Sequence, residues 1–232
     1  MGLSHSPLLP TNGLVMCIDP RNKKSYGGSG TTVTDLVGNY NGTLTNGPTF
    51  DSNKKALVFD GTNDWLDSGF GNDSSFFLAA AGSAFSVVIC FKPSNAGIIC
   101  GAAGGIGSST TFAMYTRNGS TSDLKDFEIR LRGTSSNNTV KSDISVNSFH
   151  LGAFTWDGTS ALGYYNNEPP VTVGVGTAGN QNYRYGIADP RNGTLGNYSR
   201  FQGSVIYNYI YDRALTAREI RSIYESTKRG FE

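Results

Sequence analysis

The stretch Phe85-Ser-Val-Val-Ile-Cys-Phe-Lys-Pro93 determines the fold class. It is almost continuously apolar until Pro93 ends it, which is typical of a strand buried on both faces. A different pattern follows in Asp126-Phe-Glu-Ile-Arg-Leu-Arg132, where apolar and charged residues alternate. Such alternation predicts an antiparallel strand with one face in the core and a solvated, charged face opposite. The two patterns together predict an all-β protein.

Further short apolar segments recur along the chain and are separated by turn residues, mainly Gly, Asn and Asp. Glycine is unusually frequent, with 30 of 232 residues, as expected for many strands joined by tight turns. We expect these additional strands at 13–19, 56–60, 65–67, 97–100, 111–115, 139–144, 149–156, 161–166, 170–175 and 201–211.

One helix is expected, near the C-terminus. Thr216-Ala-Arg-Glu219 is a capping box, in which the Thr hydroxyl and the Glu carboxylate satisfy backbone amides at a helix start. Ile220, Ile223 and Tyr224 then form a short apolar stripe. Such a stripe is enough to dock a short helix on a sheet.

Composition and charge limit the function classes. Charged residues make up 16% of the chain, against about 25% in an average domain, and the net charge is +1, which argues against nucleic-acid binding. The N-terminus has no secretory signal pattern, and small polar residues interrupt the uncharged run 74–91, so we expect no membrane span. No linker divides the chain, so we expect an extended N-terminal arm at 1–12 and one domain at 13–232.

The cysteines bear on the compartment. Cys17, Cys90 and Cys100 each lie in an apolar run, and no two of them form a C-x-x-C pair. We therefore expect free buried thiols in a protein made in a reducing cytoplasm.

Several segments together resemble the laminin-G-like, concanavalin A-like jelly-roll family over roughly residues 13–228. The segments that carry this resemblance are Gly13-Leu-Val-Met-Cys-Ile-Asp19, the Asn/Gly-rich run 35–50, Leu57-Val-Phe-Asp-Gly-Thr-Asn-Asp-Trp65, the strand 85–93, Phe154-Thr-Trp-Asp-Gly-Thr159 and the stretch 201–220. The resemblance implies an antiparallel jelly-roll β-sandwich of the concanavalin A-like lectin/glucanase type, with a short C-terminal helix.

The first 65 residues also resemble virion structural proteins of tailed phages. This resemblance implies a capsid decoration or accessory protein on the particle surface, assembled in the host cytoplasm and present in symmetric copies. Its partners would be the major capsid protein or tail proteins, and Leu8 and Leu9 of the N-terminal arm would anchor it to a neighbouring subunit. The alternative is a carbohydrate-binding adhesin that recognises a host surface glycan.

Catalysis is not expected. A retaining glycosidase needs two carboxylates close together, with one of them held protonated. The nearest pair is Asp126 and Glu128, but Arg130 and Arg132 interleave with them and favour the ionised form of both. No residue spacing indicates a Ser-His-Asp set or a His/Cys metal site.

A calcium site is one interpretation of the turn that contains Asp60, Asn63 and Asp64. Lectin-like relatives hold Ca²⁺ at loop edges through such oxygen ligands. In the other interpretation these side chains satisfy turn amides through local Asx hydrogen bonds. The sequence leaves both open.

Tyrosines in or near Asn-rich loops are the candidate contact residues, namely Tyr164, Tyr165, Tyr183, Tyr185 and Tyr198. An aromatic platform surrounded by amides is what a sugar-binding face needs, and the same composition is typical of a protein–protein contact surface. The sequence does not separate a sugar contact from a protein contact.

Overall fold

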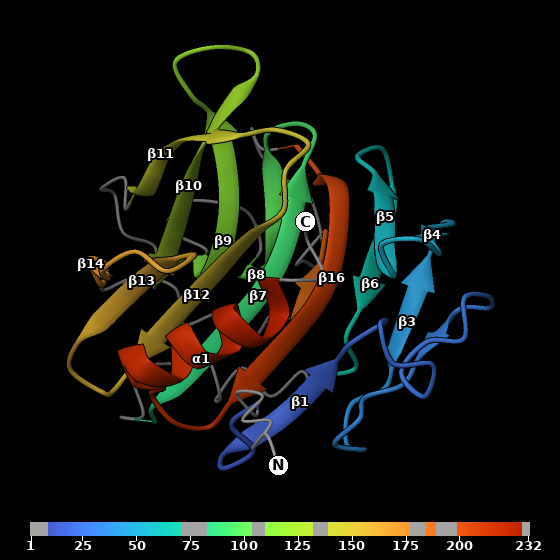
Figure 1. The fold of residues 1–232 in the computed structure, drawn as a ribbon, viewed down its shortest axis with the longest axis horizontal. Coiled ribbons are helices and arrows are strands. Elements are labelled where there is room, and N and C mark those ends of the chain that lie inside the picture. Colours follow the sequence, from blue (N-terminus) through green and yellow to red (C-terminus); the bar gives the residue numbers. More distant parts are fainter. Residues whose placement is uncertain are drawn as a thin grey trace, which may run out of the picture.

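A computed structural model describes residues 9–70, 83–103, 110–131, 139–176, 184–188 and 199–228. These residues form two antiparallel sheets and one C-terminal helix (Figure 1). The elements are β1 (Leu14–Ile18), β2 (Thr32–Val33), β3 (Gly42–Thr45), β4 (Thr49–Asp51), β5 (Ala56–Asp60), β6 (Trp65–Asp67), β7 (Phe85–Pro93), β8 (Gly97–Ala103), β9 (Thr110–Asn118), β10 (Leu124–Leu131), β11 (Thr139–Ser145), β12 (His150–Trp156), β13 (Ala161–Tyr165), β14 (Val171–Thr172), β15 (Gly186–Ile187), β16 (Gln202–Tyr211) and α1 (Ala217–Thr227).

The first sheet has the strand order β14-β13-β12-β7-β16-β5-β4, and the second has the order β11-β10-β9-β8-β15-β6-β3-β2. Long strand β16 pairs with β7 along one edge, and β5 and β1 share its other edge. Strands far apart in sequence are therefore neighbours, as in a jelly roll. The expected all-β antiparallel jelly-roll sandwich with a short C-terminal helix is confirmed.

Strand β7 lies between two apolar cores. Its odd residues Val87, Ile89 and Phe91 belong to the core between the two sheets, and its even residues Val88 and Cys90 belong to a second core beneath α1. Both faces of the strand are thus covered, which is why its sequence is almost continuously apolar. The expectation of a strand buried on both faces is confirmed.

Helix α1 covers the outer face of the first sheet (Figure 1). Ile220 and Ile223 are buried against the sheet, and the hydroxyl groups of Thr227 and Tyr207 lie within hydrogen-bond distance of each other, at 2.9 Å. Thr216 caps the helix by accepting from the backbone N–H of Glu219, whose carboxylate accepts from the backbone N–H of Thr216. The expected capping box and the expected helix are both confirmed.

Most expected strands form within a few residues of their expected limits, with three departures. The segment 170–175 forms only the short strand β14, no strand was expected at β15, and β2, β3 and β4 occur in or beside the Asn/Gly-rich run 35–50, where no strand was expected. These strands are two to four residues long, too short to show a hydrophobic period. All three cysteines are buried and free, as expected. No helix in the described part of the chain is long and apolar enough to cross a membrane.

Candidate functional site

The tyrosines proposed as contact residues do not form an exposed platform. Tyr164 is 4% exposed, Tyr165 is 8% exposed and Tyr185 has no exposed surface. Tyr164 and Tyr165 are consecutive on β13, so one ring enters the core beneath α1 and the other enters the core between the sheets. Tyr183 and Tyr198 lie outside the described residues. The interpretation of Tyr164, Tyr165 and Tyr185 as surface contacts is therefore corrected to one of core packing.

Two of these tyrosines hold buried polar groups instead. The Tyr165 hydroxyl lies 2.8 Å from Nδ1 of His150, whose Nε2 lies 2.8 Å from the carbonyl oxygen of Ser145. A neutral His150 that donates from Nε2 and accepts at Nδ1 satisfies both contacts. Burial lowers the pKa of His150 below its usual value, which favours that neutral form. The Tyr185 hydroxyl donates to Oδ1 of Asn208 across the core at 2.9 Å.

In the turn considered for calcium, the carboxylates accept hydrogen bonds from backbone amides of the same turn. Asp60 Oδ1 accepts from the backbone N–H groups of Thr62, at 2.7 Å, and Asn63, at 3.3 Å. Asp64 is 4% exposed, and its Oδ2 accepts from the backbone N–H of Asp60 at 3.1 Å. No group of three or more His, Cys, Asp or Glu residues among those described could hold a metal ion. This geometry corresponds to the Asx-turn interpretation.

Asp35, in the neighbouring Asn/Gly-rich run, is the centre of a backbone hydrogen-bond network. One carboxylate oxygen accepts from the N–H groups of Cys17 and Val37, and the other accepts from those of Asn39 and Tyr40. The side chain is 1% exposed. Four amide donors fill the carboxylate, so it shapes the loop around β1 and is not available to a metal ion.

The N-terminal arm is only partly described. Leu9 is half-buried and packs against the core beneath α1 of its own chain. It lines an open hollow next to Arg213, Thr216 and Glu219 at the start of the helix. Leu8 lies outside the described residues. Leu9 therefore has an intramolecular packing role, and the anchoring of a neighbouring subunit by the arm stays a prediction.

The alternating strand β10 places its charges as expected but buries them. Glu128 is 1% exposed and Arg130 is 8% exposed, which corrects the expectation of a solvated face. The Tyr115 hydroxyl donates to Glu128, Arg130 Nε donates to the Tyr115 hydroxyl at 3.0 Å, and Arg117 pairs with Glu128 at 3.1 Å. Burial raises the pKa of Tyr115. These groups pair with one another, so the cluster is a structural part of the second sheet.

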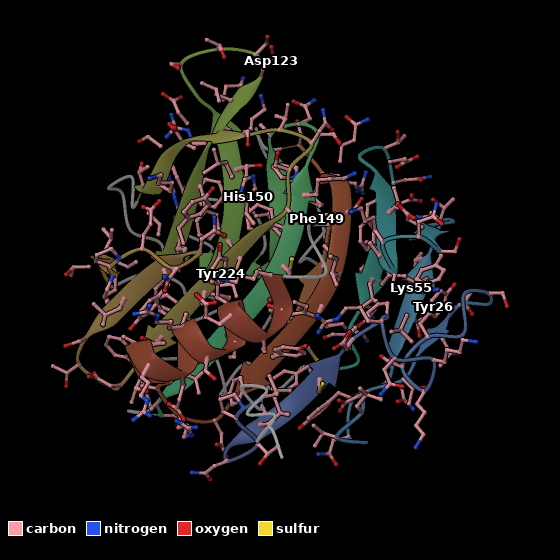
Figure 2. The ribbon with its side chains drawn as sticks, in the orientation of Figure 1. Tyr26, Lys55, Asp123, Phe149, His150 and Tyr224 are labelled. Carbon is pink, nitrogen blue, oxygen red and sulfur yellow. The ribbon has the colours of Figure 1, made fainter. Side chains whose placement is uncertain are left out.

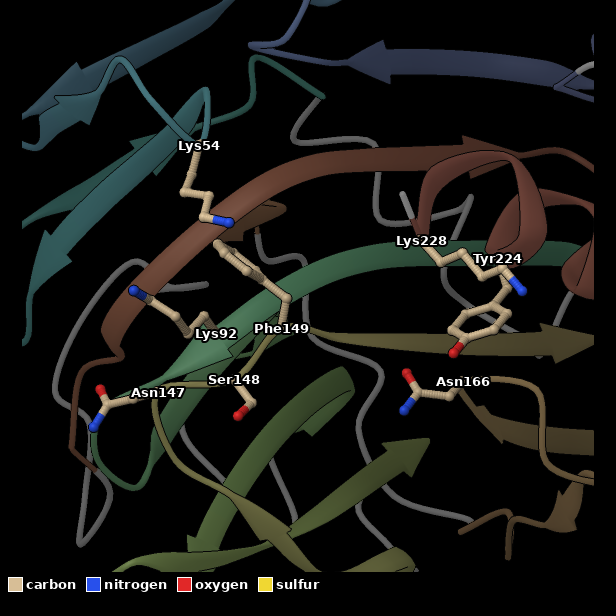
Figure 3. Close-up of a pocket in the computed structure, with 8 residues that line it drawn as sticks. All are labelled: Lys54, Lys92, Asn147, Ser148, Phe149, Asn166, Tyr224 and Lys228. Atoms are coloured by element: carbon tan, nitrogen blue, oxygen red, sulfur yellow. The ribbon is translucent and has the colours of Figure 1, made fainter. Parts of the chain in front are cut away.

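A groove of about 380 Å³ lies on the outer face of the first sheet, beyond the C-terminal end of α1. We call it the lysine groove. Figure 3 shows Lys54, Lys92 and Asn147 on one side of the Phe149 ring, and Tyr224, Lys228 and Asn166 on the other. Figure 2 shows that Phe149 and Tyr224 lie on the face of the molecule that carries α1. The lysine groove is lined by Lys54, Lys92, Asn147, Ser148, Phe149, Asn166, Tyr224 and Lys228.

The layering of the sheet creates this groove. Lys92 continues the row of β7 residues that α1 covers, and Phe149 continues the matching row of β12. Leu151 pairs with Cys90 and His150 with Phe91, so the same register brings Phe149 opposite Lys92. The helix ends before it reaches this pair, which therefore lies at the surface. Lys92 Nζ is 5.4 Å from the centre of the Phe149 ring, a cation–π distance.

Two asparagines fix the loops around the aromatic ring. Asn147 and Asn166 both adopt left-handed backbone conformations, with φ of 60° and 49°, which Asn tolerates better than most residues. The Asn147 N–H donates to the carbonyl of Pro93 at 2.8 Å. The Asn166 side-chain oxygen accepts from the Leu151 N–H at 2.8 Å. The Asn147 backbone and the Asn166 side chain are therefore held at defined places beside half-buried aromatic side chains.

A smaller hollow of about 200 Å³ lies along the flank of α1. We call it the proline hollow. Asn166 lines both it and the lysine groove, so the two hollows adjoin. The proline hollow is lined by Tyr164, Asn166, Asn167, Glu168, Pro169, Pro170, Ala217, Ile220 and Arg221.

Sequence reasoning did not single out Lys54, Lys92, Phe149 or Lys228. They come from four separate segments, and only the packing of α1 on the sheet brings them together. One local signal was present, because Lys92 breaks the apolar pattern at the end of the strand 85–93. The Asn166-Asn167 loop does lie at the site. Tyr164 and Tyr165 beside it are buried and do not supply the aromatic surface of the groove.

Comparison with known proteins gives similarity at the level of structure. No protein-family model matches the chain, and no curated protein sequence does. A sialidase of Trypanosoma rangeli, solved in complex with 2,3-difluoro-KDN, matches 99% of this chain and 36% of its own, with a TM-score of 0.68 and 16% identity. A mutant of that sialidase with trans-sialidase activity matches 97% and 34%, with a TM-score of 0.66 and 16% identity. This chain therefore spans 34% to 36% of the length of these sialidases.

A third similar structure is a domain of about the same extent as this chain. It is domain 4 of AbnA, a GH43 extracellular arabinanase from Geobacillus stearothermophilus, solved in complex with arabinotriose. It matches 91% of this chain and 98% of its own, with a TM-score of 0.61 and 15% identity. At this level of identity these similarities establish the β-sandwich fold alone.

These comparisons correct the main functional prediction. The similar structures described above are sialidases and an arabinanase domain, so the prediction of a phage capsid decoration protein is wrong. The virion location and the virion partners rested on the same resemblance. The predicted absence of nucleic-acid binding and the predicted symmetric homo-oligomer stay predictions.

Proposed function

We propose that this chain is a carbohydrate-binding protein and that the lysine groove holds the saccharide. The observation that carries the proposal is the combination of half-buried aromatic side chains with amide and hydroxyl side chains in one groove. Phe149 and Tyr224 supply the aromatic surface, and Asn147, Ser148 and Asn166 supply the polar groups.

This combination suits the chemistry of a sugar. One face of a pyranose ring presents C–H groups, which an aromatic ring covers favourably because apolar surface leaves water. The rim of the sugar presents hydroxyl groups, each a donor and an acceptor that amides and hydroxyls can pair with. The Asn166 side chain is held by a hydrogen bond from the Leu151 N–H, so little entropy is lost when it binds a ligand.

The known structures support the same function. Domain 4 of AbnA shares the fold over nearly all of its length and was solved in complex with arabinotriose. The sialidases also act on sugars, but this chain spans only 34% to 36% of their length. The shared fold is therefore compatible with a binding domain. The narrower assignment to the laminin-G-like family stays a prediction.

We propose that the function is binding without hydrolysis. A retaining or inverting glycosidase needs two carboxyl groups beside the scissile bond. None of the described residues that line the lysine groove is acidic. The pair considered from sequence is already engaged, since Asp126 accepts from the Asp143 N–H at 3.0 Å and Glu128 is paired with Arg117.

A glycan array with the full chain tests the proposal. We compare the natural sequence with Phe149→Ala and with Phe50→Ala, which removes another half-buried phenylalanine, at the sheet edge formed by β4. Loss of the aromatic surface should weaken binding about tenfold or more in Phe149→Ala. Phe50→Ala should bind as the natural sequence does.

The melting temperature of each variant is measured first, so that unfolding is not mistaken for loss of binding. Equal weakening in both variants would mean that fold stability, and not the groove, determines binding. If the folded natural chain binds no glycan on the array, carbohydrate binding is overturned.

A further inference from the structure

The lysine groove carries a concentration of positive charge that carbohydrate binding alone does not require. Lys54 comes from the turn before β5, Lys92 from β7 and Lys228 from the C-cap of α1. All three side chains are half-buried, so their charges are screened less than those at the open surface. The chain as a whole has a net charge of only +1, so this cluster is a local feature.

Among the described residues, the carboxylates of Glu225 and Asp51 lie near the lysines of the groove. Glu225 pairs with Lys228 at 2.5 Å, one turn of α1 away. Asp51 accepts from the Lys54 backbone N–H, which lowers its pKa, and the charges of Lys92 and Lys54 lower that pKa further. Asp51 is outside the lining of the groove, and the Glu225 pair is an exposed one of small energy. The lining itself is positive.

The helix dipole acts in the opposite direction. The C-terminal end of α1 carries a partial charge of about −0.5, which disfavours an anion. Glu225 offsets the charge of Lys228, and the two charges of Lys54 and Lys92 still exceed that partial charge. The basic cluster is therefore the dominant electrostatic feature of the groove.

The two hollows along α1 also differ in charge. Asn166 joins the lysine groove to the proline hollow, where Asn167 and Pro169 face α1 near Ala217. The helix between Ala217 and Lys228 is about 17 Å long, from its rise per residue. Basic side chains are concentrated at the Lys228 end, and in the proline hollow Glu168 pairs with Lys141 at 2.7 Å. A ligand bound along α1 would contact basic side chains at the Lys228 end and side chains of both charges at the Ala217 end.

We propose that the ligand is an acidic oligosaccharide. Its carboxylate or sulfate group lies beside Lys54 and Lys92, and its remaining sugars extend past Asn166 and Lys228 along α1. The Phe149 ring covers the sugar that bears the acidic group. This inference rests on the proposed function and adds the class of saccharide and its orientation.

Matched pairs of oligosaccharides test the inference, from disaccharides to pentasaccharides. Each uronate oligosaccharide is compared with its methyl ester, which keeps the ring and removes the charge. Each sulfated oligosaccharide is compared with its unsulfated parent. The two kinds of pair distinguish a carboxylate ligand from a sulfate ligand. Affinity is measured by calorimetry at low and at physiological salt, because an ionic contribution falls as salt rises.

The variant Lys92→Gln removes one charge and keeps most of the stem over Phe149. Lys23→Gln makes the same change at an exposed lysine outside the groove. Lys92→Gln should weaken binding of the acidic member about threefold to tenfold more than it weakens binding of the neutral member. Lys23→Gln should change neither. Asn167→Ala should weaken the binding of only the longer oligosaccharides.

The outcomes separate the two proposals. A preference for the acidic member that disappears in Lys92→Gln supports the inference. Equal binding of both members, unchanged in Lys92→Gln, overturns the acidic ligand and keeps carbohydrate binding. No binding to either member of any pair, by folded protein, overturns both.

Discussion

Lys92 Nζ lies 5.4 Å from the centre of the Phe149 ring, and the two residues stand on adjacent strands at the point where α1 no longer covers the sheet. The contact holds the long lysine stem over apolar surface and keeps its charge at the groove. The same two rows of residues are core further along β7 and β12. The site is thus an uncovered continuation of the core beneath the helix.

Tyr165→Phe should destabilise the fold without affecting sugar binding. The substitution removes the hydroxyl that contacts His150 Nδ1, which should cost about 1 kcal/mol. The neutral imidazole also loses a hydrogen bond, so the pKa of His150 should rise. Chemical denaturation measures the first effect and an NMR titration of the imidazole measures the second. If binding were lost and stability kept, Tyr165 would be a ligand contact after all.

Burial of His150 also makes stability depend on pH. Its pKa is lowered in the folded state, so below about pH 6.5 the unfolded chain takes up a proton more readily than the folded chain. This contribution to stability should be fully present above that pH and should decline as the pH falls below it. Denaturation curves between pH 7.5 and pH 5 measure the decline. A His150→Gln variant that declined equally over the same range would contradict the assignment.

Tyr185→Phe should cost about 1 to 3 kcal/mol, because Asn208 Oδ1 would be left without its donor in the centre of the core. Tyr40→Phe is the control, since Tyr40 is half-buried and packs its ring against Phe70. Urea unfolding of both variants gives the comparison. Equal stability of Tyr185→Phe and the natural chain would show that this hydrogen bond contributes nothing.

The helix cap should be sensitive to acid. Arg213 pairs with Glu219 at 2.6 Å and lowers the pKa of that carboxyl from 4.5 to about 2. A lowered pKa means that the contribution to stability is present above about pH 4.5 and is lost as the pH falls toward 2. Glu219→Gln should remove this part of the acid dependence, and Thr216→Ala should cost about 1 kcal/mol at neutral pH. Far-UV circular dichroism at stepped pH follows both variants.

Calcium should not stabilise the fold through the turn at Asp60, Asn63 and Asp64. Backbone amides already occupy Asp60 Oδ1 and Asp64 Oδ2. The melting temperature should therefore agree within about 1 °C between calcium and a chelator, because only a ligand that binds the folded state raises it. A larger calcium-dependent rise, abolished in Asp60→Asn, would restore the calcium interpretation.

The strands and the helix could be predicted because their signals are local. The apolar run 85–93, the alternation at 126–132 and the capping box at Thr216 each depend on neighbouring residues. The burial of side chains on the outer faces of the sheets could not be predicted in the same way. Strand β10 looks like a half-exposed strand, yet Glu128 and Arg130 are buried, and they pair with Tyr115 and Arg117 on β9. Such cross-strand pairs leave no periodic trace in the sequence.

The candidate site was mislocated for a related reason. Tyr164 and Tyr165 lie beside an Asn-rich loop, but they belong to a strand covered on both faces, so neither ring is exposed. Phe149 reads as the start of a buried strand, and it is only half-buried because α1 ends before reaching it. The length and placement of one helix therefore decide which aromatic residue a ligand can reach.

Mapping of the saccharide on the protein by NMR tests the central claim most directly. The strongest oligosaccharide from the array is titrated into labelled protein, and the backbone amide shifts are followed. The account predicts saturable shifts at Lys92, Phe149 and Asn166, with the turn around Asp60 unaffected. Saturable shifts confined to the Asp60 turn or to the outer face of the second sheet would contradict it.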